Sequence, residues 1–305
     1  CQHATLDQHW LASTMSDYRI ALPLGRGDLA VKTWHDASIQ AVPILAVHGW
    51  MDNAGTFNRL APMLKGHRIH ALDLAGHGLS DPRPDGMRYH NADFLDDIYA
   101  AMQHIEPNNG PLILLGHSLG AGLLMLLAGI FPERVQALIM IDGLGPISAE
   151  PSNYATDTRT ALEGLMSYSP SRKPIASVEQ AVAARRQGIT GMLSESASRD
   201  LCERALIETE AGELRWRTDK RLRLNSLMRF SEEQVLACIE AITAPCLLVT
   251  GDAGLPKQLG KNKPRYAARL SHFGRLEQVN LSGGHHLHLD DCPEQVADAI
   301  NAFLA

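Results

Sequence analysis

The chain has 305 residues, of which 45% are hydrophobic and 20% charged, so it is long enough to bury one large hydrophobic core. Its net charge of -6 and the lack of a long Lys or Arg run argue against a nucleic-acid or membrane partner. No apolar run approaches the roughly 20 residues of a membrane span, and the N-terminal region has no signal-peptide pattern. We therefore expect a cytoplasmic protein whose residues 1–14 form an N-terminal tail.

The five cysteines are odd in number and scattered without C-x-x-C spacing. This pattern argues against a disulfide framework and against a cysteine zinc site. We expect free, reduced thiols.

The first part of the chain alternates short apolar runs with longer helical patterns. Two strands joined by a turn come first, and then strand, helix, strand and helix follow. The expected ranges are 18–23, 28–34, 43–49, 56–64, 67–74 and 91–105. Strands separated by helices predict a mostly parallel, doubly wound α/β sheet.

The alternation continues with a strand at 110–115, a helix at 119–131 and a strand at 135–142, and then stops for about a hundred residues. Residues 178–189 and 196–210 have helical spacing inside this gap. We expect residues 143–241 to form a helical cap, or lid, inserted after strand six. Core segments 15–142 and 242–305 flank it, and the second has strands at 244–252 and 275–281, a helix near 262–271 and a final helix from Pro293.

Gly116-His117-Ser118-Leu119-Gly120 stands between an apolar strand and an apolar helix, and this context makes G-x-S-x-G informative. A serine in a strained turn can project its hydroxyl above the sheet, provided that its neighbours lack side chains that would clash. The first amides of the helix then point at the same place, where negative charge is favoured. The pattern predicts that Ser118 is a nucleophile.

A serine nucleophile needs a base, and "SGGHHLHLDD" (282–291) supplies histidines after the last strand. The carboxyl ends of parallel strands share one sheet edge, so this loop is expected beside Ser118. The sequence also resembles the α/β-hydrolase superfamily through four motifs in the expected order, and two further stretches resemble its serine hydrolase-like branch. The motifs are "HGW" (48–50), "DLAGHGLSD" (73–81), "GHSLG" (116–120) and "GGHHLHLDDCPE" (283–294), and the branch stretches are 48–64 and 216–235.

In that resemblance the base is the histidine after Ser-Gly or Gly-Gly, with a second histidine three residues later and an acidic residue five later. His285 fits, through His288 and Asp290. Counting back from Pro293 favours His286 instead. A metal site at His-His-x-His is a weaker alternative because no second cluster has ligand spacing, so we expect no metal or cofactor.

The resemblance also implies an oxyanion hole made of the backbone N–H groups of Trp50 and Leu119. His48 is expected to brace the loop that carries Trp50. His77 and His117 are interpreted in the same way, as structural histidines.

The acid departs from the family pattern, which places it three residues after the glycine that ends strand seven. Here Gly254 stands at that position. Asp142 at the end of strand six and Asp252 are the two candidates, and we favour Asp142. An aspartate at a strand end can instead cap a turn.

These residues predict a serine hydrolase that forms an acyl-enzyme, most simply a carboxylesterase acting on a small-molecule ester. C–C bond hydrolysis and cofactor-free perhydrolysis can share such a triad. A ligand-binding receptor or inactive homologue is the alternative from another class. Ser118 argues against dehalogenase or epoxide hydrolase chemistry, because the resembling members use Asp at that position.

Overall fold

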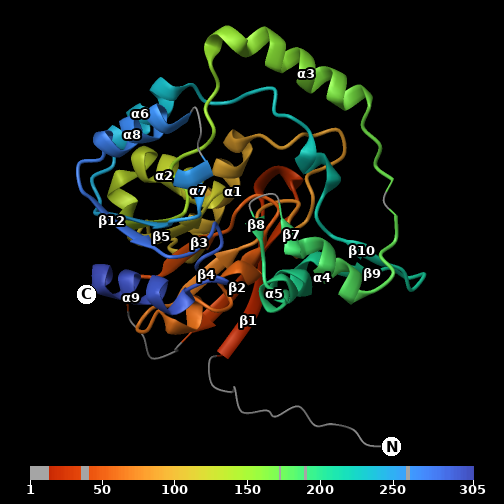
Figure 1. The fold of residues 1–305 in the computed structure, drawn as a ribbon, viewed down its shortest axis with the longest axis horizontal. Helices are drawn as coiled ribbons and strands as arrows, with labels where there is room; N and C mark the ends of the chain where they lie inside the picture. Colours follow the sequence, from red (N-terminus) through yellow and green to blue (C-terminus); the bar gives the residue numbers. More distant parts are fainter. Residues whose placement is uncertain (1–13, 36–40, 172, 189–190, 259–261) are drawn as a thin grey trace, which may run out of the picture.

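An eight-stranded sheet forms the centre of the molecule (Figure 1). The computed structural model describes residues 14–35, 41–171, 173–188, 191–258 and 262–305. The strand order is β1-β2-β4-β3-β5-β6-β11-β12; β2 runs antiparallel to both of its neighbours, and every other neighbouring pair is parallel. The strands are β1 Thr14–Ala21, β2 Asp28–His35, β3 Ile44–Val47, β4 Ile69–Leu72, β5 Leu112–His117, β6 Val135–Ile141, β11 Cys246–Gly251 and β12 Leu276–Leu281.

Helices cover both faces of this sheet, as the predicted doubly wound α/β fold requires. One face packs against α1 (Asn91–Ile105), α2 (Leu119–Ile130), α6 (Glu232–Glu240) and α8 (Lys263–His272), and the other against α9 (Pro293–Leu304). Alternation along a strand assigns side chains to opposite faces.

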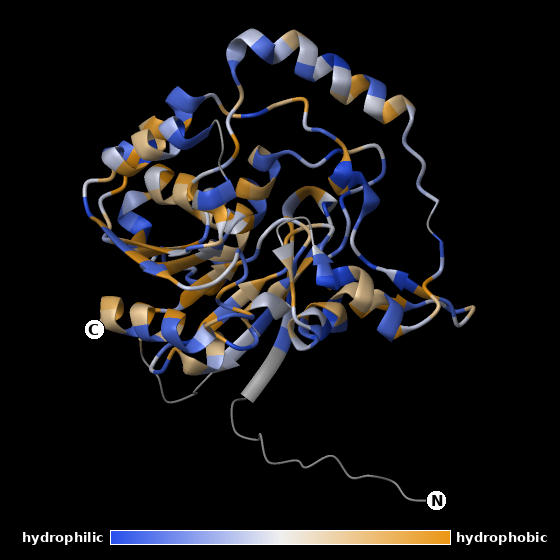
Figure 2. Ribbon diagram, in the orientation of Figure 1, coloured by the Kyte–Doolittle hydropathy of each residue, from blue (hydrophilic) through white to orange (hydrophobic). Residues whose placement is uncertain are grey.

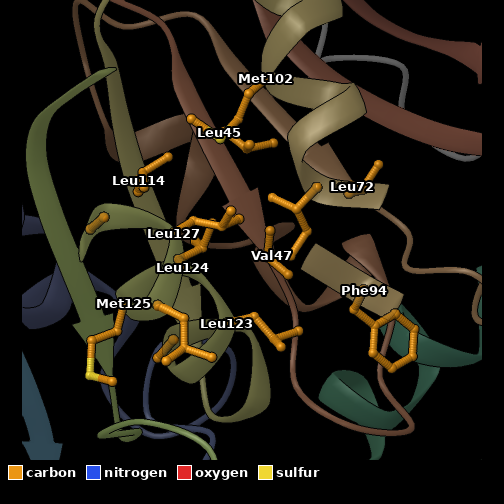
Figure 3. Packing of buried hydrophobic residues seen from close by; sticks show 14 of the residues in the cluster. Leu45, Val47, Leu72, Phe94, Met102, Leu114, Leu123, Leu124, Met125 and Leu127 are labelled. Atoms are coloured by element: carbon orange, nitrogen blue, oxygen red, sulfur yellow. The ribbon is translucent and has the colours of Figure 1, made fainter. Parts of the chain in front are cut away.

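The parallel strand β3 shows this alternation. Leu45 and Val47 join the larger core cluster, where Figure 3 shows them close to Leu124 and Leu127 of α2. Ile44 and Ala46 face the other cluster. All four residues are fully buried, which explains why the strand reads as a continuous apolar run.

The prediction of a helix at 56–64 is wrong. The chain instead forms two 3-10 turns, Ala54–Phe57 and Ala61–Met63. Pro62 lies inside the second turn, and a proline cannot donate the backbone hydrogen bond that a helix interior needs. The apolar residues that suggested a helix are nevertheless buried, Phe57 and Leu60 completely.

The segment between β6 and β11 contains α3 (Tyr154–Met166), α4 (Val178–Arg186), α5 (Glu195–Ala205) and two short hairpins. The helices expected over 178–189 and 196–210 therefore end earlier than predicted. Short strands follow them: β7 (Gln187–Gly188) pairs with β8 (Gly191–Met192), and β9 (Leu206–Glu208) pairs with β10 (Leu214–Trp216).

Buried ion pairs hold α4 and α5 against the core. Arg204 of α5 contacts the fully buried Asp73 at 2.8 Å, and Arg185 of α4 contacts the buried Asp52. By contrast α3 buries only Ala161 and lies on the outside of the molecule, with apolar residues exposed along its length (Figure 2). Although α6 falls within the predicted cap range 143–241, it packs against α2.

The predicted tail at 1–14 lies outside the described residues except for Thr14, which begins β1. Among the residues that the structure describes, no helix is both long enough and apolar enough to cross a membrane.

Candidate active site

Ser118 occupies a sharp turn between β5 and α2. Its backbone has φ 50° and ψ -113°, a strained conformation for a residue with a side chain. A Cβ on Gly116 would overlap the backbone of Ala121, and one on Gly120 would overlap the carbonyl of Val47. The two glycines of the motif are therefore required by close backbone contacts, as the sequence predicted.

The sheet register brings Asp142 next to Ser118. His117 and Ile141 are partners on the parallel strands β5 and β6, and Ser118 and Asp142 follow them directly. The amide of Ser118 donates to the carbonyl of Ile141 at 3.0 Å. Like Ser118, Asp142 has a positive φ, 43°, and its side chain is fully buried.

Asp142 is also in contact with His285. Nδ1 of His285 lies 2.6 Å from Oδ2 of Asp142, so this nitrogen donates the proton and Nε2 is left as the basic nitrogen. The same carboxylate accepts hydrogen bonds from the amides of Gly251 (3.1 Å) and Leu255 (2.7 Å). Three donors thus fix the position of the Asp142 carboxylate.

The loop after β11 explains the missing acid at the family position. A Cβ on Gly254 would overlap the carboxylate of Asp142, so the structure leaves no room for a side chain there. Asp252 is exposed and accepts a hydrogen bond from the amide of Gly283 at 3.0 Å. This hydrogen bond joins Asp252 to the loop that precedes His285, whereas the ring of His285 contacts Asp142.

His286 forms a second histidine–aspartate pair. Its Nε2 lies 3.0 Å from Oδ2 of Asp52, whose other oxygen contacts Arg185. Burial alone would raise the pKa of Asp52, but the nearby charges of His286 and Arg185 and the hydrogen bond from His286 hold that pKa well below its usual value. The two alternatives for the base therefore have different partners: His285 meets Asp142, and His286 meets Asp52.

Asp52 is the residue of this region that sequence reasoning missed. It lies two residues after Trp50, within the stretch 48–64, which entered the sequence interpretation only through its resemblance to the serine hydrolase-like branch. Nothing in its local spacing indicates a contact with His286, which lies more than 200 residues further along the chain. Its place two residues after the expected oxyanion residue was the available signal.

His117 and His288 complete a group of buried rings. Nε2 of His117 lies 2.9 Å from the carbonyl oxygen of His285, and burial lowers the pKa of His117 to about 4. Nε2 of His288 lies 3.0 Å from Oγ1 of Thr56, and burial lowers the pKa of His288 well below its usual value. The side chain of His117, directly before Ser118 in the chain, thus contacts the backbone of His285, the residue expected to act as base.

The bracing role predicted for His48 is confirmed. Its Nδ1 lies 2.7 Å from the carbonyl oxygen of Gly49, and its Nε2 accepts from the amide of Leu74 at 3.0 Å. Burial lowers its pKa. Trp50 follows in a turn closed by the Asp52 amide and the Gly49 carbonyl at 3.1 Å.

The two expected oxyanion donors belong to neighbouring strands of the sheet. Trp50 follows β3, and Leu119 begins α2 after the Ser118 turn that ends β5. Because β3 and β5 are parallel neighbours, both residues lie at the same sheet edge. The amide of Leu119 is in the first turn of α2, where backbone N–H groups lack partners within the helix. Trp50 as a whole residue is 42% exposed.

Comparisons with known proteins identify the family of this chain. A family model described as the α/β hydrolase fold matches residues 42–291. A probable serine hydrolase from Drosophila melanogaster is 33% identical, with 94% of this chain and 87% of that protein covered. A serine hydrolase-like protein from Danio rerio is 29% identical, with 97% and 92% covered.

A solved structure is also similar. The crystal structure of a hypothetical protein from Pseudomonas aeruginosa PAO1 is 37% identical and superposes with a TM-score of 0.84, covering 94% of this chain and 99% of that one. The sequence resemblance and the predicted fold are thus confirmed. The chain belongs to the α/β hydrolase fold family, and within it to the serine hydrolase-like branch.

Proposed function

We propose that the protein is a serine hydrolase that works through an acyl-enzyme, with carboxylic esters of small to medium acyl length as substrates. The hydrogen bond between His285 and Asp142, next to the strained turn of Ser118, is the observation that carries this proposal. It holds Nδ1 of the imidazole protonated and leaves Nε2 free to accept a proton.

In the proposed reaction, Ser118 Oγ attacks the ester carbonyl carbon while His285 Nε2 takes the hydroxyl proton. The resulting oxyanion accepts hydrogen bonds from the amides of Trp50 and Leu119. The imidazolium then donates its proton to the leaving alkoxide, and the C–O bond breaks. Water, deprotonated by His285, releases the acid and regenerates Ser118.

Asp142 stabilises the imidazolium without taking its proton. Its three hydrogen-bond donors keep the carboxylate from turning away from the ring when the charge forms. Every proposed step uses side chains and amides of this chain. Selectivity for the acyl group is assigned to the cap, because the proposed triad and both oxyanion donors lie outside it.

The test is covalent labelling followed by kinetics. A labelled fluorophosphonate should modify the wild-type chain at Ser118 and leave Ser118→Ala unmodified. The wild type, but not Ser118→Ala, should hydrolyse p-nitrophenyl esters of increasing acyl length. His272→Gln, on α8, is the matched control and should behave as wild type. Wild-type turnover by a purified, folded Ser118→Ala protein would contradict the serine mechanism.

A further inference from the structure

Asp52, His117 and His286 bring three potential metal-ligand atoms together in the core. One carboxylate oxygen and two ring nitrogens lie within 4.8 Å of one another, and all three residues are buried. They come from the loop after β3, the end of β5 and the loop after β12, so only the fold assembles them. None of the three is part of the proposed triad.

The hydrogen bonds define which nitrogen of His117 is available. Its Nε2 faces the carbonyl oxygen of His285 at 2.9 Å, and because a carbonyl only accepts, this nitrogen must carry the proton. The ring is fully buried, which favours its neutral form. Nδ1 of His117 therefore carries a lone pair and no proton.

That lone pair lies close to another electron-rich atom. Nδ1 of His117 lies 3.5 Å from Oδ2 of Asp52 and has no hydrogen-bond partner among the described residues. Oδ2 is also the atom that His286 Nε2 approaches at 3.0 Å. A cation between these three atoms would satisfy all of them.

The spacing suits a small divalent ion. Tetrahedral zinc with ligand bonds of about 2.0–2.1 Å requires its ligand atoms to be about 3.3 Å apart, close to the 3.0 and 3.5 Å measured from the Asp52 oxygen. Gly49 keeps the adjacent space open, since a Cβ there would come within 3.0 Å of His117 Nδ1 and 3.2 Å of Asp52 Oδ2. Two imidazoles and one carboxylate are typical donors for zinc and similar metals.

We propose that Asp52, His117 and His286 bind a divalent first-row transition-metal ion such as Zn²⁺. This metal site is distinct from the proposed triad of Ser118, His285 and Asp142, and no step of the proposed hydrolysis passes through it. Binding displaces the Nε2 proton of His286 to solvent. Arg185 contacts the other oxygen of Asp52, so its positive charge opposes the ion and sets its affinity.

The site is tested on the full chain after EDTA treatment, by calorimetric titration with Zn²⁺ and by the visible spectrum with Co²⁺. We expect one Zn²⁺ per chain and the intense Co²⁺ bands of a four-coordinate site. Asp52→Asn and His286→Gln should each weaken Zn²⁺ binding at least 10-fold, and Arg185→Gln should strengthen it. His272→Gln, a histidine on α8, is the matched control and should bind as wild type.

Gly49→Ala keeps all three ligands and narrows the site, so it should also weaken binding, and a circular dichroism melt verifies that each variant is folded. Absence of Zn²⁺ binding by the wild type at 100-fold molar excess would overturn the proposal. Equal binding by folded His286→Gln and Gly49→Ala would overturn it too, because the ion would then sit elsewhere. The titration uses no ester, so its result is independent of whether the proposed hydrolysis is correct.

Discussion

The carboxylate of Asp142 occupies the space that a side chain on Gly254 would need. An acidic side chain at position 254, after β11, and the carboxylate of Asp142, at the end of β6, therefore cannot both occupy this site. Asp142 enters from the strand beside Ser118, and the loop after β11 contributes backbone amides to it in place of a carboxylate.

The two candidate acids can be separated by kinetics. Asp142→Asn should lower kcat by about 10⁴-fold, the loss seen when a triad protease loses its orienting carboxylate, with little change in Tm. Asp252→Asn should change kcat far less, since Asp252 holds the Gly283 amide instead. Esterase assays and thermal melts of both variants provide the measurement, and a larger kcat loss in Asp252→Asn would move the acid to the loop after β11.

Acid should destabilise the protein through its buried neutral histidines. Burial lowers the pKa of His77 to about 3 and also lowers that of His48, whereas an unfolded histidine titrates near 6.5. Below about pH 6.5 the unfolded chain therefore binds protons that the folded one does not, so the free energy of unfolding falls as pH falls, by up to about 1.4 kcal/mol per pH unit for each group. Denaturant melts between pH 7 and 4 should show this slope, and His77→Gln should flatten it; an unchanged slope in that variant would contradict the assignment.

The ion pair between Arg204 and Asp73 should matter for stability far more than a surface pair on the same helix. Arg204→Met removes the cation that pairs with the fully buried carboxylate of Asp73, which should cost about 3–5 kcal/mol. Arg199→Met removes only the exposed pair with Glu195 and should cost less than about 1 kcal/mol. Urea titrations compare the two, and equal costs would show that the buried pair is not what holds α5.

Cap residues should control acyl selectivity. A cavity of about 220 Å³ lies between α3 and residues 225–229, with Thr158 and Met228 in its lining. If the acyl chain occupies the cap as proposed, filling this cavity with Met228→Trp should shift the preferred p-nitrophenyl ester toward a shorter acyl chain while labelling of Ser118 by the fluorophosphonate persists. Met192→Trp, on the exposed β8, is the control. If neither variant alters the chain-length profile, selectivity resides in the core instead.

Local patterns predicted the parts of the fold that depend on local physics. The buried run of β5, the helix α1 over 91–105 and the glycines around Ser118 all follow from strand burial, helical period and backbone clashes that a short window of sequence contains. The prediction of a helix at 56–64 was wrong because the apolar spacing there reflects burial against the sheet rather than helical hydrogen bonding.

The partners of the candidate site were harder to predict. His285 and His286 are adjacent in sequence, and which of them meets Asp142 depends on how the loop after β12 crosses the sheet edge. Asp142 could be proposed from its strand, but the exclusion of a side chain at Gly254 is a contact between distant segments. The pairing of Asp52 with Arg185 has the same origin, because it depends on how the cap docks.

The unequal burial of the cap helices also divides the molecule by local stability. The helices α4 and α5 are fastened by charged pairs that lose most of their solvent contact, whereas α3 buries a single residue, Ala161. Opening α3 alone exposes little new apolar surface and breaks few contacts, so its backbone amides can exchange with deuterium through small fluctuations. Exchange of the α5 amides requires the Arg204–Asp73 contact to break first. Of the cap helices, α3 is therefore the one that can open at the lowest cost, and its opening leaves the Arg204–Asp73 contact intact.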